Sequence, residues 1–427
     1  MKAFYLIGAS LFVSGVACSQ SLDGIFNEKE ITRVETILAH DNMKGRATFT
    51  PSIDKAAEFI STEFKKAGLE PLDKNGSYLQ TFSMVQPKFI STSATINNKN
   101  FESKNVLVFT AQPKVKITEQ LNYEKGYIKA GQNLFGAAQS FIQADKNYIV
   151  QVDLSFAKNF NRLIFLKKYL FKTDKNVVFV LSNEEIKGYT IEAEHEIQDL
   201  KLSNVVGVLP GRKLKNEYVI FSSHYDHIGI ENSGKPDSIY NGANDDAAGT
   251  TAVISLAKYF KSLKNNERSI IFVAFTAEEV GGFGSQYFSN QLNPAKVAAM
   301  FNIEMIGTES KWGENAAYIT GFDKSNMGEI MQKNLDGTQF KFYPDPYLEQ
   351  SLFYRSDNAT LARKGVPAHT ISTSKMDVEP NYHKVSDEVS TLNLTNMANI
   401  IKAIALSSTS IISGKDTPSR VDTTQLQ

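Results

Sequence analysis

Between residues 217 and 407 the chain alternates short apolar runs with segments whose apolar residues recur every three or four positions. "EYVIFSS" at 217–223 and "SIIFVAFT" at 269–276 are such runs, and "AAGTTAVISLAKYFKSL" at 247–263 separates them with helical periodicity. A short apolar run bounded by polar residues is typical of a buried strand, and the helical period indicates a helix with one apolar face. Strands alternating with helices predict an α/β fold with a mixed, mostly parallel sheet that helices cover on both sides.

The residues before this region show two other patterns. Residues 28–70 have helical periodicity, interrupted by the loop "DNMKGRATFTP", whereas residues 78 to about 200 contain short alternating runs separated by Lys- and Asn-rich connectors. Alternation of that kind is typical of strands. We therefore predict an amino-terminal part of the main domain at 23–84, a β-rich inserted domain at 85–200, the main part of the domain at 201–410 and a loose tail at 411–427.

The first 18 residues predict an export signal. Lys2 is followed by an apolar run and then by small residues, and the run is too short to cross a bilayer comfortably. Cys18 stands where a bacterial lipoprotein signal places its lipidated residue, so we expect a lipid anchor there and a periplasmic or membrane-anchored lipoprotein of a bacterium. Gly15 and Ala17 also fit ordinary signal-peptide cleavage, which leaves a plain periplasmic or secreted protein as the alternative.

Composition restricts the function to a local site. Cys18 is the single cysteine, so we expect no internal disulfide and no metal site built from thiolates. The charges balance, with 46 Lys and Arg against 46 Asp and Glu. A neutral chain gives no sign of binding nucleic acid or an anionic membrane surface, and we infer no obligate protein partner.

Acidic and imidazole side chains follow directly after several predicted strands. The carboxyl ends of parallel strands meet at one edge of a sheet, where open α/β folds bind their ligands. These side chains therefore predict one common site. They are His224 and Asp226 in "SSHYDHIG", Asp245 and Asp246 in "NGANDDAAGT", Glu278 and Glu279 in "FTAEEVGG", Glu304 in "FNIEMIG" and His383 in "NYHKVSD".

This set of residue types favours a metal site that performs hydrolysis. Imidazoles and carboxylates without thiolates are typical of hydrolytic zinc sites, and their number exceeds what one tetrahedral ion needs. We therefore expect two zinc ions that share a bridging carboxylate. Glu278 and Glu279 point opposite ways in extended chain, so one should bind metal while the other acts as a base. Asp226 is placed to hold the second imidazole nitrogen of His224, and we interpret His227 as a supporting or packing residue.

The five motifs in this order resemble those of the cocatalytic zinc exopeptidases of metallopeptidase family 28. The motifs are "HYDH", "GANDDAAG", "AEEVGGFGS", "NIEMIG" and "YHKVSD", within residues 202–405. The family includes bacterial leucyl aminopeptidases and, more distantly, glutamate carboxypeptidase II, and "GRATFTPSIDKAAEFISTEFKKAGLEPL" is similar to the amino-terminal segment of its bacterial members. The resemblance implies the three-layer α-β-α zinc-exopeptidase fold, with the insertion comparable to a reduced protease-associated domain.

Carried over position by position, the resemblance implies a pair of zinc ions that share one carboxylate. Glu304 stands where the family usually has aspartate, and its extra methylene lets the carboxylate reach farther. Zinc accepts either carboxylate, so ligation by Glu304 remains the expectation. The implied ligands are Asp245 as the bridge, His224 and Glu304 on one ion, and Glu279 and His383 on the other.

The resemblance also implies roles for residues that do not bind metal. Glu278 would be the general base, Asp226 would orient His224, and the Asp245–Asp246 peptide is a candidate for a non-proline cis bond. Arg46, in "KGRATFTP", is interpreted as bracing a loop. Asn358 stands where the family commonly has histidine, and we assign it no role beyond supporting the site.

The expected function is that of a zinc-dependent exopeptidase. An aminopeptidase that hydrolyses the amino-terminal residues of peptides through a metal-bridged water fits the resemblance best. Three alternatives stay open at this point: a glutaminyl-peptide cyclotransferase with a single zinc, a carboxypeptidase, and a catalytically silent binding protein of the same fold.

Overall fold

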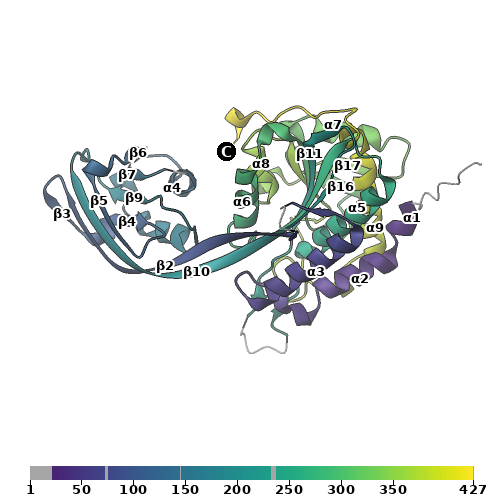
Figure 1. Ribbon diagram of the computed structural model, residues 1–427, viewed down its shortest axis with the longest axis horizontal. Coiled ribbons are helices and arrows are strands. Elements are labelled where there is room, and N and C mark those ends of the chain that lie inside the picture. The colour runs from purple at the N-terminus through teal and green to yellow at the C-terminus, as the bar shows by residue number, and fades with distance from the viewer. Residues whose placement is uncertain (1–21, 73–75, 145, 232–236, 427) are drawn as a thin grey trace, which may run out of the picture. The chain divides into compact units, whose positions relative to one another are not determined.

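The computed structural model describes residues 22–72, 76–144, 146–231 and 237–426, and it divides into two compact units (Figure 1). The first unit comprises the described residues up to Gln80 together with those from Asn204 onward, and the second comprises Thr81–Ser203. The predicted insertion ran from 85 to 200. Two long strands, β2 (Leu79–Ile96) and β10 (Tyr189–Leu209), carry the chain into and out of the second unit.

The first unit is built on a mixed, mostly parallel sheet, as the alternation of strands and helices predicts. Strand β11 pairs in parallel with both of its neighbours, β14 and β15, and β15 pairs in parallel with β18. Strands β10 and β16 add antiparallel pairings toward the two sides. The strand order is β17 (Lys341–Pro344), β16 (Ala316–Ile319), β18 (Ala368–Ser372), β15 (Val297–Ile303), β11 (Leu214–His224), β14 (Arg268–Phe275) and β10.

Both faces of this sheet are buried, because successive strand residues point to opposite sides. Val219 and Phe221 belong to one apolar cluster, whereas Ile220 between them belongs to another. The first cluster packs against helices α2 (Glu28–Leu38), α3 (Pro51–Ala67), α5 (Ala248–Leu263), α7 (Met327–Asn334) and α9 (Leu394–Ser407). The second packs against α6 (Phe283–Gln291) and α8 (Asn358–Ala362), which completes three layers (Figure 1).

The second unit contains a helix that the sequence reasoning did not foresee. Its four-stranded sheet has the order β4 (Val106–Phe109), β9 (Val177–Leu181), β7 (Tyr148–Val152) and β6 (Glu124–Ile128). Strands β6 and β7 are parallel, and parallel neighbours need a crossover connection. Helix α4 (Leu134–Gln143) lies in that crossover and buries Leu134 and Ala138, so the insertion is a mixed α/β unit.

Several short elements complete the structure. Helices α1 (Leu22–Ile25) and α10 (Thr409–Ile412) are single turns. The remaining strands are β1 (Glu70–Pro71), β3 (Lys99–Phe101), β5 (Lys114–Thr118), β8 (Leu170–Phe171), β12 (Gly229–Ile230) and β13 (Ile239–Tyr240).

The carboxyl-terminal tail, which we expected to be loose, is held against the first unit. The buried guanidinium of Arg268 donates from Nη1 to the carbonyls of Ile411 and Asp416, at 2.7 and 2.8 Å. Val421 is buried, and Arg420 donates to the carbonyl of Val297 at 2.8 Å. The polar composition of the tail did not indicate these contacts, because they are hydrogen bonds between arginines and backbone carbonyls.

Within the described residues, no helix has the length and apolar character that crossing a membrane requires. The predicted export signal and Cys18 lie outside the described residues.

Candidate metal centre

The side chains predicted to form one site converge at the carboxyl edge of the sheet. His224 is the last residue of β11, Glu278 and Glu279 follow β14, and Glu304 follows β15. Because β11 is parallel to both of these neighbours, the three strands end at the same edge. Asp245 lies in the turn before α5, and His383 lies in the loop between β18 and α9.

Asp245 stands at the centre of this group. Its Oδ1 lies 3.1 Å from His224 Nε2, and its Oδ2 lies 3.2 Å from His383 Nε2. His383 Nε2 is also 3.2 Å from Glu279 Oε2. The two oxygens of one buried carboxylate therefore face two different imidazoles, which is the arrangement expected of a carboxylate that bridges two cations.

Two groups of donor atoms around Asp245 fit a metal ion. In His224, Asp245 and Glu304, and again in His227, Asp245 and Glu279, one ligand atom per residue lies within 4.8 Å of the others. His224 Nε2, His227 Nε2 and Glu304 Oε2 are buried and have no hydrogen-bond partner among the described residues. Buried polar atoms normally have partners, so these atoms are suited to a cation. Nitrogen and carboxylate oxygen donors of this kind fit zinc.

His227 contacts the proposed metal ligands directly, which its position in the sequence did not indicate. Its Nδ1 donates to Glu279 Oε1 at 2.8 Å and lies 3.9 Å from Asp245 Oδ2. The ring of His227 also lies beside His383, with centroids 5.8 Å apart. The only sign of this contact in the sequence was the second histidine of the motif "HYDH". Its spacing from His224 did not decide whether His227 supports a metal ligand or binds metal itself.

The Asp245–Asp246 peptide bond is cis, as predicted. The buried Asp246 carboxylate accepts from three backbone amides: Oδ2 from His224 at 3.2 Å, and Oδ1 from Gly249 at 3.0 Å and Met305 at 3.1 Å. It thereby joins the end of β11, the first turn of α5 and the residue after Glu304. Gly249 is required here, since a Cβ at this position would lie 2.2 Å from the carbonyl oxygen of Ile303.

Two buried groups outside the predicted set hold the turn that carries Asp245. Asp387, in the "YHKVSD" motif, accepts from the amides of Asn244 and Asp245 at 2.8 and 3.0 Å. The guanidinium of Arg46 donates to four carbonyl oxygens: Leu38, Tyr225, Asn241 and Gly242, at 2.6 to 2.9 Å. The interpretation that Arg46 braces a loop is confirmed. The carbonyls that it binds belong to the end of α2, to the segment after β11 and to the turn that leads to Asp245.

Asp226 acts differently from the prediction. Its carboxylate Oδ1 lies 3.8 Å from His224 Nδ1, beyond hydrogen-bond distance, and the backbone carbonyl of Asp226 accepts from that nitrogen instead, at 3.1 Å. The carboxylate accepts from the amides of Glu278 and Glu279, at 3.0 and 3.3 Å, and from Thr48 Oγ1 at 3.0 Å. These three donors occupy the carboxylate, so it orients the turn that bears the two glutamates.

Burial and neighbouring charges separate the pKa values of the carboxylates. Burial raises the pKa of Glu278 well above its usual range and raises that of Glu304 to about 7. Burial also opposes ionisation of Asp245, but its contacts with His224 and His383 outweigh that effect and lower its pKa. The same contacts, with Asp245 and Glu279, raise the pKa of His383 to about 10. Burial therefore gives the Glu278 carboxylate a higher affinity for a proton than an exposed glutamate has, which suits a group that accepts a proton during a reaction.

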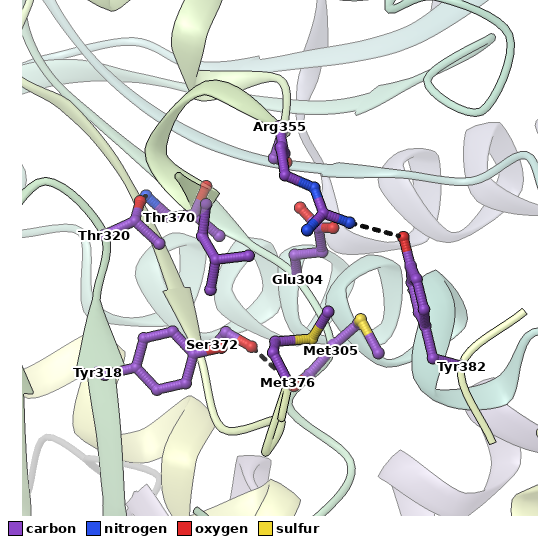
Figure 2. Close-up of a pocket in the computed structure, with 11 residues that line it drawn as sticks. Glu304, Met305, Tyr318, Thr320, Arg355, Thr370, Ser372, Met376 and Tyr382 are labelled. Carbon is purple, nitrogen blue, oxygen red and sulfur yellow. Dashed lines mark hydrogen bonds between the residues drawn. The ribbon is translucent and has the colours of Figure 1, made fainter. Parts of the chain in front are cut away.

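A pocket opens beside Glu304 (Figure 2). Its walls come from the ends of β16 and β18 and from the loops around Met305, Leu352 and Tyr382. Figure 2 shows Glu304 and Arg355 pointing into the same space. The lining residues are Glu304, Met305, Tyr318, Thr320, Leu352, Arg355, Ser356, Thr370, Ser372, Met376 and Tyr382.

Residues 204–408 match the family model described as Peptidase family M28. Aminopeptidase YwaD of Bacillus subtilis (strain 168) is 28% identical over 109 residues, which are 25% of this chain and 22% of that protein. Aminopeptidase Y of Saccharomyces cerevisiae is 25% identical over 217 residues, which are 44% of this chain and 40% of that protein. The matched segments thus span less than half the length of these relatives.

The fold as a whole is similar to solved zinc aminopeptidases. BSAP, a zinc aminopeptidase from Bacillus subtilis, superposes with a TM-score of 0.55 at 16% identity, over 93% of this chain and 98% of that chain. This likeness supports the three-layer α/β fold with its mostly parallel sheet, and at such identity it supports the fold alone.

The relatives contradict the predicted location. They include fungal proteins, namely the Saccharomyces cerevisiae aminopeptidase and probable zinc metalloproteases of two Pyrenophora species. Because the relatives include fungal proteins, the resemblance does not specify a bacterial periplasmic lipoprotein, and that prediction is wrong.

Proposed function

Residues 204–408 belong to peptidase family M28, and from that premise we propose that the chain is a zinc-dependent aminopeptidase that removes amino-terminal residues from peptides. The observation that carries the proposal is the position of Asp245, whose two carboxylate oxygens lie 3.1 and 3.2 Å from the imidazoles of His224 and His383. The named aminopeptidases among its relatives support the choice of an exopeptidase that acts on amino termini.

We propose that this centre binds two zinc ions, with Asp245 between them. His224 and Glu304 would bind one ion, and Glu279 and His383 the other. His227 would hold Glu279 in place by donating from Nδ1 to Oε1, which fixes the orientation of that carboxylate. When bound, zinc polarises the scissile carbonyl and lowers the pKa of water toward neutrality.

Glu278 would act as the general base in this reaction. Its raised pKa suits it to accept a proton from the attacking water and to pass that proton to the departing amine. Asp226 supports this role, because its carboxylate accepts from the Glu278 amide at 3.0 Å and so fixes the backbone from which the base projects.

Hydrolysis of leucine p-nitroanilide by the purified chain tests the proposal. We expect activity that a chelator abolishes and zinc restores, and no activity on the amino-acetylated analogue, because an aminopeptidase needs a free amino group. Metal analysis by mass spectrometry should find two zinc ions per chain. Cleavage of amino-blocked peptides from their carboxyl end, or cyclisation of amino-terminal glutamine without hydrolysis, would contradict the proposal that the chain is an aminopeptidase.

A further inference from the structure

The pocket beside Glu304 contains an arginine that has no acidic partner in the described part of the chain. Of the described residues that line the pocket, Glu304 and Arg355 are charged, and the others are hydroxyl-bearing, apolar or aromatic. Among the described residues, the hydrogen-bond partners of the Arg355 guanidinium are Gln350 Oε1 and Tyr382 Oη, each at 3.5 Å. Both distances are at the outer limit of a hydrogen bond, so most of the donor capacity of this guanidinium is unused.

Glu304 does not neutralise Arg355. No described carboxylate forms an ion pair with this guanidinium, although Figure 2 shows both side chains directed into the pocket. In the proposed function Glu304 is occupied as a metal ligand, which leaves the guanidinium of Arg355 free to meet an anionic group of a substrate. Arg355 both lines the pocket and is exposed, so an incoming group can reach it.

A guanidinium in this setting recognises a carboxylate. Its planar fork matches a carboxylate with two parallel hydrogen bonds, whereas a substrate ammonium would meet a like charge. The apolar and aromatic wall, formed by Met305, Tyr318 and Met376, accommodates the methylene carbons that precede such a group. The hydroxyl of Thr320, which accepts from the Thr370 amide at 3.1 Å, also lines the pocket and can donate to such a group.

We propose that Arg355 selects peptide substrates that present a carboxylate next to the scissile bond. The carboxylate can come from the side chain of an acidic amino-terminal residue or from the terminal carboxylate of a short peptide. This inference rests on the proposed function, because it takes the pocket beside Glu304 to be the place where the substrate lies during hydrolysis.

Two matched substrate pairs separate the sources of the carboxylate. Glutamate p-nitroanilide is compared with glutamine p-nitroanilide, and the dipeptide Ala-Ala is compared with its carboxyl-terminal amide. We expect kcat/KM of the zinc-loaded enzyme to be about 10-fold or more higher for the charged member of at least one pair, the effect of one charge-assisted hydrogen bond. Arg355→Gln should remove this preference by lowering kcat/KM for the charged member about 10-fold or more relative to the neutral member.

Arg363→Gln is the matched control, because it removes the same charge from an exposed arginine of the same segment that does not line the pocket. It should keep the preference, and Arg355→Glu should reverse it in favour of lysine p-nitroanilide. Unchanged zinc content and thermal unfolding would establish that each variant is folded.

Equal kcat/KM for both members of both pairs in an active wild-type enzyme would overturn the role of Arg355 and leave the proposed function intact. The same holds if Arg355→Gln keeps the preference. A zinc-loaded chain inactive on all four substrates would contradict the proposed function itself and remove this inference with it.

Discussion

Replacing Arg46 by lysine should weaken both the fold and the metal centre, although Arg46 touches none of the predicted ligand side chains. The guanidinium donates from Nη1 to Leu38 and Asn241, from Nε to Tyr225 and from Nη2 to Gly242. Lysine keeps the buried charge but concentrates its donors at one atom. An ammonium near the Nη1 position can keep two of these bonds and must lose the other two.

The two lost bonds set the size of the effect. Hydrogen bonds to charged groups contribute about 1.5–3 kcal/mol each, so Arg46→Lys should lower the free energy of unfolding by about 3–6 kcal/mol. At roughly 2–4 °C per kcal/mol, the melting temperature should fall by at least about 6 °C. The carbonyls that lose their donors belong to Tyr225, between His224 and Asp226, and to Gly242, which leads into the Asp245 turn. Zinc affinity should therefore fall by about 10- to 100-fold, as when groups that orient metal ligands are removed.

Arg268→Lys is the matched control for this experiment. Arg268 is also buried, and it also donates from Nη1 to two carbonyls and from Nε and Nη2 to one further group each. It begins β14, whereas Glu278 and Glu279 follow the other end of that strand. Thermal unfolding with chelator and competitive zinc titration of both variants would separate the two effects. The reasoning is refuted if the two variants bind zinc with equal affinity.

Three further predictions test other parts of the molecule. Glu278→Gln should keep both zinc ions but lower kcat by about 10²- to 10⁴-fold, and near-normal turnover would exclude it as the base. His383→Ala should lose one zinc ion per chain, which mass spectrometry would disprove by finding two retained. In the second unit, burial lowers the pKa of His195 to about 4 and that of the adjacent Lys167 to about 8. Because the folded state then binds fewer protons than the unfolded chain, stability is lost as pH falls from about 6.5 to 4, where His195 must protonate. The protection factors of the amides in β4, β6, β7 and β9 should fall over that range, and less so in Lys167→Met.

The fold of the first unit could be predicted because its strands and helices carry different periods. A run such as "SIIFVAFT" is apolar on both sides because both faces of its strand are covered, and α5 follows the 3.6-residue period. In the second unit α4 escaped prediction, since the alternating strands on either side dominated the pattern. The ordered tail was not predicted for a different reason. Its backbone carbonyls accept from Arg268, and the side-chain composition does not indicate such hydrogen bonds.

The convergence of the predicted site residues followed from one rule, that parallel strands end at a common edge. The rule located His224, Glu279 and Glu304, and the motifs added Asp245 and His383. It could not reveal that the Asp226 carboxylate would bind the Glu278 and Glu279 amides rather than His224. That choice depends on which donors lie within 3 to 4 Å, and the spacing of two residues along the chain does not specify it.

The sequence by itself determined which residues occupy the sheet edge, because the periodicity that marks each strand and the residues that follow it are local properties of the chain. Only the tertiary structure decided how those residues are held. Arg46 and Asp387 are far from Asp245 in sequence, yet they fix its turn through hydrogen bonds to backbone atoms. Backbone atoms are the same at every residue, so the partners of a buried charge are set by the packing that brings them within reach.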